Sequence, residues 1–155
     1  MPPTAAGSYS SLGASAASWG PAVGVWEQLR VLEYTEGDFF LPHRDHACEV
    51  GQSTLHPFCR SFFSLLLYLE DSVDGCGATR FYLDAEPPQD DADDPRARAM
   101  RQHDRPSGGV VVADVVPMAG RVCVFPHRLL HESMAITPGM RKCVVRGDVL
   151  YGQGA

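Results

Sequence analysis

Short apolar runs alternate with turn-forming residues along this chain, and the three-to-four-residue spacing of an amphipathic helix is almost absent. Apolar runs of about four to eight residues, bounded by Gly, Pro or Asp, are typical of buried strands. The pattern predicts strands over 29–34, 62–69, 79–83, 110–116, 121–125, 142–146 and 149–151. Many short strands with few or no helices indicate an all-β core, for which we expect a jelly roll (double-stranded β-helix).

Two segments depart from this pattern. Residues 1–24 are rich in Ala, Ser, Gly and Pro and carry almost no large apolar side chains, so we expect a flexible leader before an ordered domain over 25–155. Residues 84–109 are first acidic and Pro-rich and then basic. They predict a long charged loop on the surface of the domain, as a lid, a binding loop or a disordered insertion.

Composition narrows the classes of function. A chain of 155 residues with a net charge of -6 is one domain without a basic stripe, which argues against a nucleic-acid partner. No apolar run has the length of a membrane span and no signal peptide is visible, so we expect an intracellular, cytoplasmic protein away from membranes. The five cysteines form no C-x-x-C pair and are odd in number, which predicts neither a zinc ribbon nor a full disulfide framework.

His43 and Asp45 are the first candidates for chemistry. If residues 40–46 are extended, the period of two places both side chains on one face and Arg44 on the other. An imidazole nitrogen and a carboxylate oxygen could then bind a single metal ion. A third ligand must come from a distant strand, and His131 follows the apolar run at 122–125. The alternative for an isolated H-x-D pair is a surface His and Asp without a ligand.

The other histidines compete with this set. In an extended strand, His46 faces away from the pair, while His56 and His103 lie in expected loops. His127 precedes His131 by four residues and could share a metal with it only if this segment were helical. The set of two histidines and one carboxylate is the facial triad that holds iron(II) with open coordination positions.

Arg141 is the second candidate. Alternation along 141–146 places Arg141 on the same face as the apolar Cys143 and Val145, with Lys142 and Arg146 on the opposite face. A buried arginine needs an anionic partner, and the carboxylate of a 2-oxo acid would pair with its planar fork. The alternative is an arginine at the rim in a salt bridge.

From Tyr34 to Tyr151 the chain resembles the iron(II)- and 2-oxoglutarate-dependent dioxygenases, in particular the prolyl 4-hydroxylase-like branch. The matching pieces occur in the order of the family: Tyr34–Asp45, Leu65–Leu69, Gly77–Phe81, Pro117–Pro126, His131, Gly139–Arg141 and Arg146–Tyr151. Departures are Cys76-Gly77 in place of Gly-Gly, Glu70 in place of Asn, and Arg141 where Lys is more common. The helices that precede the first strand in the family are not evident.

The resemblance implies a hydroxylase of an unactivated C–H bond that uses iron(II), 2-oxoglutarate and O2, with ascorbate a candidate accessory reductant. The iron ligands that it implies are His43, Asp45 and His131. The side chains that it places at 2-oxoglutarate are Arg141, Tyr34 and Tyr68, although both tyrosines could equally be core residues. The substrate would be a prolyl or other residue of a protein or peptide, or a small molecule; the oligomeric state stays open.

Two other functions compete with this interpretation. A non-catalytic jelly-roll binding module would explain the missing helices and the departure at Cys76. A cupin-type metal enzyme without a 2-oxo acid would make Arg141 a structural residue. The intact set of predicted ligands favours the dioxygenase over both.

Overall fold

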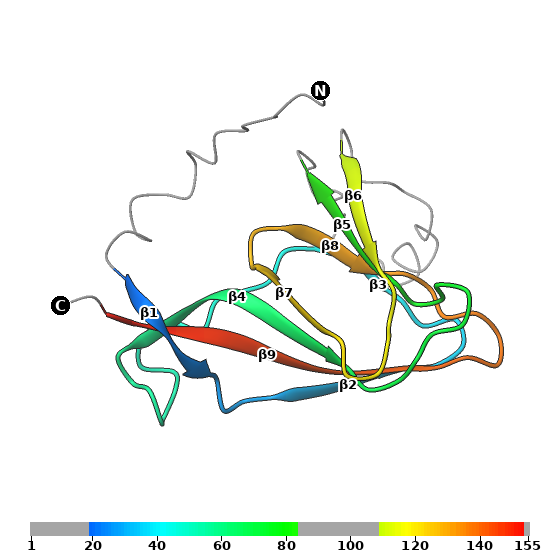
Figure 1. The fold of residues 1–155 in the computed structure, drawn as a ribbon. Helices are drawn as coiled ribbons and strands as arrows, with labels where there is room; N and C mark the ends of the chain where they lie inside the picture. The colour runs from blue at the N-terminus through cyan, green and yellow to red at the C-terminus, as the bar shows by residue number, and fades with distance from the viewer. Residues whose placement is uncertain (1–18, 84–108, 154–155) are drawn as a thin grey trace, which may run out of the picture.

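The structure is a computed structural model that describes residues 19–83 and 109–153, and within these ranges it contains nine strands and no helix (Figure 1). The strands are β1 (Trp19–Val25), β2 (Arg30–Tyr34), β3 (Phe40–His43), β4 (Cys59–Tyr68), β5 (Thr79–Leu83), β6 (Val110–Val115), β7 (Val122–Pro126), β8 (Leu130–Ser133) and β9 (Lys142–Gln153). The expected all-β class is therefore confirmed.

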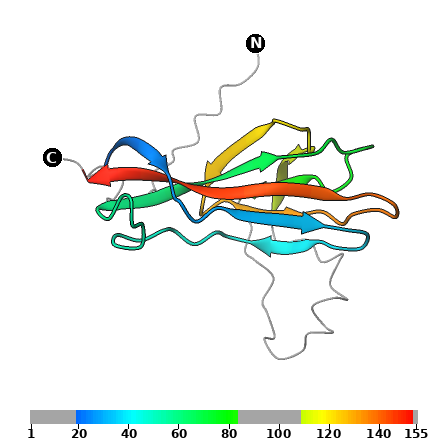
Figure 2. The ribbon, with the colours of Figure 1, turned by 90° about the horizontal axis from the view of Figure 1, so that it is seen from below.

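The strands form two antiparallel sheets. The larger has the order β1-β9-β4-β7, with β2 also paired to β9, and the smaller has the order β3-β8-β5-β6. The smaller sheet lies over one face of the larger sheet (Figures 1 and 2). The core cluster takes its residues from both sheets, namely Leu66, Tyr68, Phe81, Phe125 and Val144. This two-sheet arrangement confirms the jelly-roll expectation.

Strand β9 organises the larger sheet. Its first half pairs with β2, its second half with β1, and its other edge with β4. The sequence predicted two strands here, over 142–146 and 149–151, but Gly147 lets one strand continue. A Cβ atom on Gly147 would lie 2.9 Å from side-chain atoms of Leu29 and Val25, so the close approach of these neighbours requires glycine.

Two strands, β1 and β8, differ from the sequence predictions. Residues 19–24, expected in the leader, belong to β1, which pairs with β9 from Trp19↔Gln153 to Val25↔Val149. Strand β8 was not predicted, and it connects β3 to β5 in the smaller sheet. The rest of the expected leader, 1–18, and residues 84–108 of the expected loop lie outside the described residues. The described part of the chain has no helix that is long and apolar enough to cross a membrane.

Candidate metal and anion-binding site

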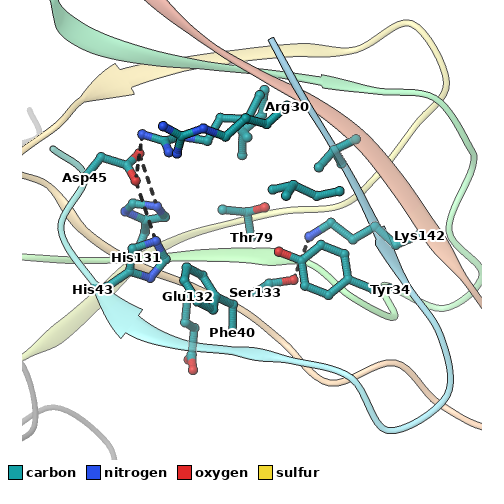
Figure 3. Close-up of a pocket in the computed structure, with 14 residues that line it drawn as sticks. Arg30, Tyr34, Phe40, His43, Asp45, Thr79, His131, Glu132, Ser133 and Lys142 are labelled. Atoms are coloured by element: carbon teal, nitrogen blue, oxygen red, sulfur yellow. Dashed lines mark hydrogen bonds and ion pairs between the residues drawn. The ribbon is translucent and has the colours of Figure 1, made fainter. Parts of the chain in front are cut away.

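A pocket of about 140 Å³ lies between the two sheets. Its lining residues come from strands of both sheets and from the segment after β3: Arg30, Leu32, Tyr34, Phe40, His43, Asp45, Leu66, Thr79, His131, Glu132, Ser133, Lys142, Val144 and Arg146. Figure 3 shows His43, Asp45 and His131 at one end and Tyr34 and Lys142 at the other, with Thr79 between them.

The three predicted metal ligands meet at the first end. His43 on β3 and His131 on β8 are register partners, and their ring centroids are 4.3 Å apart. Asp45 Oδ1 lies 3.7 Å from His43 Nε2, and Asp45 Oδ2 lies 3.7 Å from His131 Nε2. Two donors that share an ion at bonds of about 2.1 Å can be at most about 4.2 Å apart, so both separations fit one ion.

Asp45 reaches this position by a different route from the one expected. Strand β3 ends at His43, so simple alternation through residue 46 does not place the carboxylate. Instead the backbone N–H of Asp45 donates a hydrogen bond of 2.9 Å to the carbonyl oxygen of His127, which fixes the segment after β3 against the segment before β8. The two histidines and the carboxylate still converge.

Both ligand histidines present the same nitrogen to the carboxylate. His43 Nδ1 lies 2.7 Å from the carbonyl oxygen of Leu41, and His131 Nδ1 lies 2.9 Å from that of Leu129. A carbonyl only accepts, so each Nδ1 carries the proton and donates it. The neutral rings are thereby left with unprotonated Nε2 atoms, the state that binds a metal, and backbone acceptors hold their orientation.

Electrostatics keep Asp45 and His131 deprotonated. Burial raises the pKa of Asp45, but the neighbouring His43, a hydrogen bond from Ser64 and the charge of Arg146 outweigh it and hold the pKa well below its usual range. Burial, and then the neighbouring His43, lower the pKa of His131 to about 4. At neutral pH the site therefore offers a carboxylate and a neutral imidazole, as metal binding requires.

Aromatic rings pack around the two histidines. Phe40 lies 4.1 Å from the ring centroid of His43, and Phe125 lies 4.5 Å from that of His131. Phe81 contacts both Phe125 and His131, at 4.9 and 5.9 Å. These ring contacts help to fix the positions of the two histidines, and two of the three rings, Phe81 and Phe125, are buried.

Lys142 forms the other end of the pocket. Its residue is 3% exposed, and Nζ donates hydrogen bonds of 2.8 Å to the carbonyl oxygen of Gly77 and to Ser133 Oγ. Nζ also lies 5.1 Å from the ring centroid of Tyr34. Burial lowers the pKa of Lys142 to about 8, so the amine is still mostly charged at pH 7. No carboxylate of the described residues forms an ion pair with it, which leaves a buried cation without an anion.

Gly77 makes room for Lys142. Its φ of +66° favours glycine, and an added Cβ would clash with Ile136 and lie 3.2 Å from Lys142 Cδ. Cys76-Gly77, which departs from the Gly-Gly of the family pattern, therefore keeps the glycine whose carbonyl oxygen accepts a hydrogen bond from Lys142.

The structure corrects the orientation expected of Arg141. Its side chain is 65% exposed, forms an ion pair with Glu70, and does not line the pocket. The inward face of β9 carries Lys142, Val144 and Arg146 instead. Val144 is 2% exposed and sets this phase of the strand. Lys142, the neighbour of the predicted Arg141, thus faces the pocket in its place.

The two tyrosines differ in position. Tyr34 lines the pocket and pairs with Lys142 in the β2–β9 register. Tyr68 is fully buried in the core, and its hydroxyl donates a hydrogen bond of 2.8 Å to Thr79 Oγ1. Tyr68 is not among the lining residues, so its placement matches the core alternative.

Arg30 and Arg146 are lining residues that the sequence reasoning did not assign to the site. Arg146 Nη2 lies 3.0 Å from Asp45 Oδ1, directly beside the predicted ligands. Arg30 stands opposite Arg146 in the β2–β9 register. Alternation along β9 in its correct phase would have found Arg146, whereas finding Arg30 required the pairing of two strands.

His127, the competing histidine, belongs to a hydrogen-bond chain behind the carboxylate. Ser64 Oγ donates to Asp45 Oδ2 and so accepts from His127 Nδ1, at 2.9 Å. The other nitrogen, Nε2, lies 2.8 Å from Ser61 Oγ and, as the unprotonated one, accepts from it. Both nitrogens are occupied, so His127 supports Asp45 through Ser64 and is not a ligand.

No known protein family and no curated protein matches this chain. The fold is similar to those of several solved structures of low identity, among them the three that follow. The prolyl-4-hydroxylase of Pseudomonas putida is 20% identical at a TM-score of 0.46, over 82% of this chain and 52% of that one. The viral collagen prolyl hydroxylase of Paramecium Bursaria Chlorella virus-1, in a 2OG complex, is 15% identical at 0.40, over 81% and 61%. HygX from Streptomyces hygroscopicus, in its apo form, is 18% identical at 0.45, over 84% and 61%.

The chain thus spans about half to three fifths of the length of the solved structures that it matches. Two of them are prolyl hydroxylases. At these identities a shared fold does not transfer an activity, which has to be argued from the site.

Proposed function

We propose that the chain is an iron(II)- and 2-oxoglutarate-dependent dioxygenase that hydroxylates an unactivated C–H bond. The observation that carries the proposal is one pocket with a set of two histidines and one carboxylate at one end and a buried, unpaired lysine at the other. His43, Asp45 and His131 would hold iron(II), with all their ligand atoms within 4.8 Å of one another. Bound there, iron would supply the activation of O2 that oxidises 2-oxoglutarate and the substrate.

Lys142 would pair with the distal carboxylate of 2-oxoglutarate, the role that the sequence reasoning gave to Arg141. The amine is charged and lies deep in the pocket, and its present acceptors are neutral groups of Gly77 and Ser133. Leu32 and Val144 line the pocket between the two ends and offer an apolar surface to the methylene groups of the co-substrate. The substrate predicted from the resemblance, a prolyl or other peptide residue, stays a prediction.

The first test is an anaerobic titration of the metal-free protein with iron(II) and then 2-oxoglutarate, followed by visible absorbance. We expect a weak charge-transfer band that forms only when both are present. No band in folded protein would favour the non-catalytic binding module. Iron binding without any response to 2-oxoglutarate would favour the cupin-type enzyme.

Two neighbouring variants separate the candidate carboxylate partners. Lys142→Met should raise the Kd for 2-oxoglutarate by roughly 10- to 100-fold, because it removes a charged hydrogen bond from a buried carboxylate. Arg141→Gln, the matched control, removes an exposed charge and should leave this Kd unchanged. The reverse result would return the role to Arg141. Because the pKa of Lys142 is about 8, affinity in the wild type should also fall as the pH rises above 8.

A further inference from the structure

The pocket wall formed by β2 and β9 is a ladder of three cross-strand pairs. They are Arg30↔Arg146, Leu32↔Val144 and Tyr34↔Lys142, and all six residues line the pocket. The apolar pair separates two cationic ends. The Tyr34–Lys142 end is the place proposed for the co-substrate carboxylate. At the other end Arg146 contacts Asp45, but the pairing of Arg146 with a second arginine, Arg30, beside the predicted metal ligands is unexplained.

The two carboxylates near this arginine pair, Asp45 and Asp148, both lie at Arg146 and not at Arg30. Like charges directly opposite each other on neighbouring strands are unfavourable. Arg146 is paired with Asp45 at 3.0 Å and with Asp148 at 3.5 Å, yet its Nε is buried and has no hydrogen-bond partner among the described residues. Arg30 is exposed, and no carboxylate of the described residues forms an ion pair with it. A metal ion on Asp45 would add further positive charge at this end.

We propose that Arg30 and Arg146 form an anion-binding site for the substrate, which presents a carboxylate or phosphate group to them. This inference rests on the proposed function and names the substrate class for the same pocket. The planar guanidinium pairs with either anion through two parallel hydrogen bonds. The pair extends from exposed Arg30 to Arg146, whose side chain is 15% exposed and touches Asp45. A molecule that binds there enters from the rim and holds its acidic group next to the reaction centre.

The position of the pair sets where oxidation occurs. Arg146 is 3.0 Å from a ligand carboxylate, so a substrate anchored on it brings to the metal the carbon atoms close to its own acidic group. The substrate class is therefore an acid that is hydroxylated near its carboxylate or phosphate.

The test measures anion binding on the metal-free protein, so it does not depend on turnover. The probes are inorganic phosphate, isobutyrate and its neutral isostere isobutyramide, and binding is followed by the ¹⁵N signals of the arginine side chains. We expect phosphate and isobutyrate, but not isobutyramide, to shift the Arg30 and Arg146 signals. Arg30→Gln should weaken phosphate binding by at least roughly 10-fold, Arg30→Lys less, and the exposed control Arg128→Gln not at all. Equal weakening in Arg30→Gln and Arg128→Gln, or no binding, would overturn the proposal.

A second arm distinguishes substrate from co-substrate. The phosphate titration is repeated with zinc(II) and saturating 2-oxoglutarate, where binding to the arginines should persist. Loss of phosphate binding there, with a tenfold weaker 2-oxoglutarate affinity in Arg30→Gln, would assign the pair to the co-substrate and overturn the proposal. Failure of the proposed function would give a different result. The wild-type protein would then bind no 2-oxoglutarate, whether or not it binds phosphate.

Discussion

His127 and His131 lie four residues apart, are each 5% exposed, and each have a pKa lowered to about 4, with burial as the main cause. They differ in what their nitrogens touch. His131 uses Nδ1 on a backbone carbonyl and points Nε2 at Asp45, whereas both nitrogens of His127 are engaged by serine hydroxyls. Burial and pKa therefore do not distinguish the predicted metal ligand, His131, from His127; the difference is that Nε2 of His131 faces the Asp45 carboxylate and has no hydrogen-bond partner among the described residues.

The comparison also assigns the two histidines to successive layers of one site. His131 faces the pocket, and His127 lies behind Asp45, connected to it through Ser64. Partners of this outer kind fix the orientation of a ligand and tune its affinity without binding the ion themselves. Replacing each histidine should therefore give effects that differ in size and in kind.

The largest effect is expected from His131→Ala. The change removes one of three ligands, so iron(II) affinity should fall by more than the roughly 10- to 100-fold typical of an outer partner, and the charge-transfer band with 2-oxoglutarate should vanish. Competition with a chelator measures the affinity, and circular dichroism checks the fold. Unchanged affinity in folded protein would remove His131 from the site.

A smaller loss of metal, with a loss of stability, is expected from His127→Ala. Iron(II) affinity should fall by roughly 10- to 100-fold as Asp45 loses its support. The free energy of unfolding should drop by about 1–3 kcal/mol because buried serine hydroxyls lose their partner. Urea unfolding measures the latter. His127→Asn, which can still donate toward Ser64, should restore part of the metal affinity; a loss as complete as that of His131→Ala would make His127 a ligand.

The last expected effect is a dependence of the stability on pH. A histidine of pKa about 4 in the folded state and about 6.5 in the unfolded state binds its proton only on unfolding between these values. Stability is then full above pH 6.5 and is lost as the pH falls toward 4, by at most about 1.4 kcal/mol per pH unit for each histidine. Asp148, whose pKa burial raises, acts in the opposite direction. Metal-free His127→Asn should show a shallower slope than metal-free wild type in urea unfolding at pH 4–6.5, and equal slopes would contradict this account.

Apolar patterning predicted most of the strands because each of those runs packs into one of two sheets. It missed β1, since the small residues of Trp19–Val25 resemble the leader before them. It missed β8 as well, because Leu130–Ser133 has only four residues and two of them are polar and buried: His131 and Ser133. Sequence periodicity gives no warning of a polar residue that is buried because it faces a site.

The same limitation explains the error at Arg141. Predictions from alternation assume that the polar residues of a strand face solvent. Residues 142–146 have apolar side chains on both faces, so alternation alone does not show which face is buried. Cys143 and Val145 are only partly buried, whereas Val144 belongs to the core and takes Lys142 and Arg146 inward with it. The convergence of His43, Asp45 and His131 was predictable from the sequence, because residue type and spacing indicate a metal-binding chemistry. The inward position of Lys142 was not predictable, because it depends on which face of β9 packs against the smaller sheet, and the sequence of this strand is apolar on both faces.

Strand β3 supplies His43 from the edge of the smaller sheet, where it has four residues, one neighbouring strand and an irregular register between Phe40 and His43. Short edge strands open more readily than strands paired on both sides. His131 sits on an interior strand, so the two ligands should separate through the movement of β3. The rate at which a bound ion dissociates would then be set by the opening rate of β3. Metal exchange could therefore be fast even if the affinity for the metal is high.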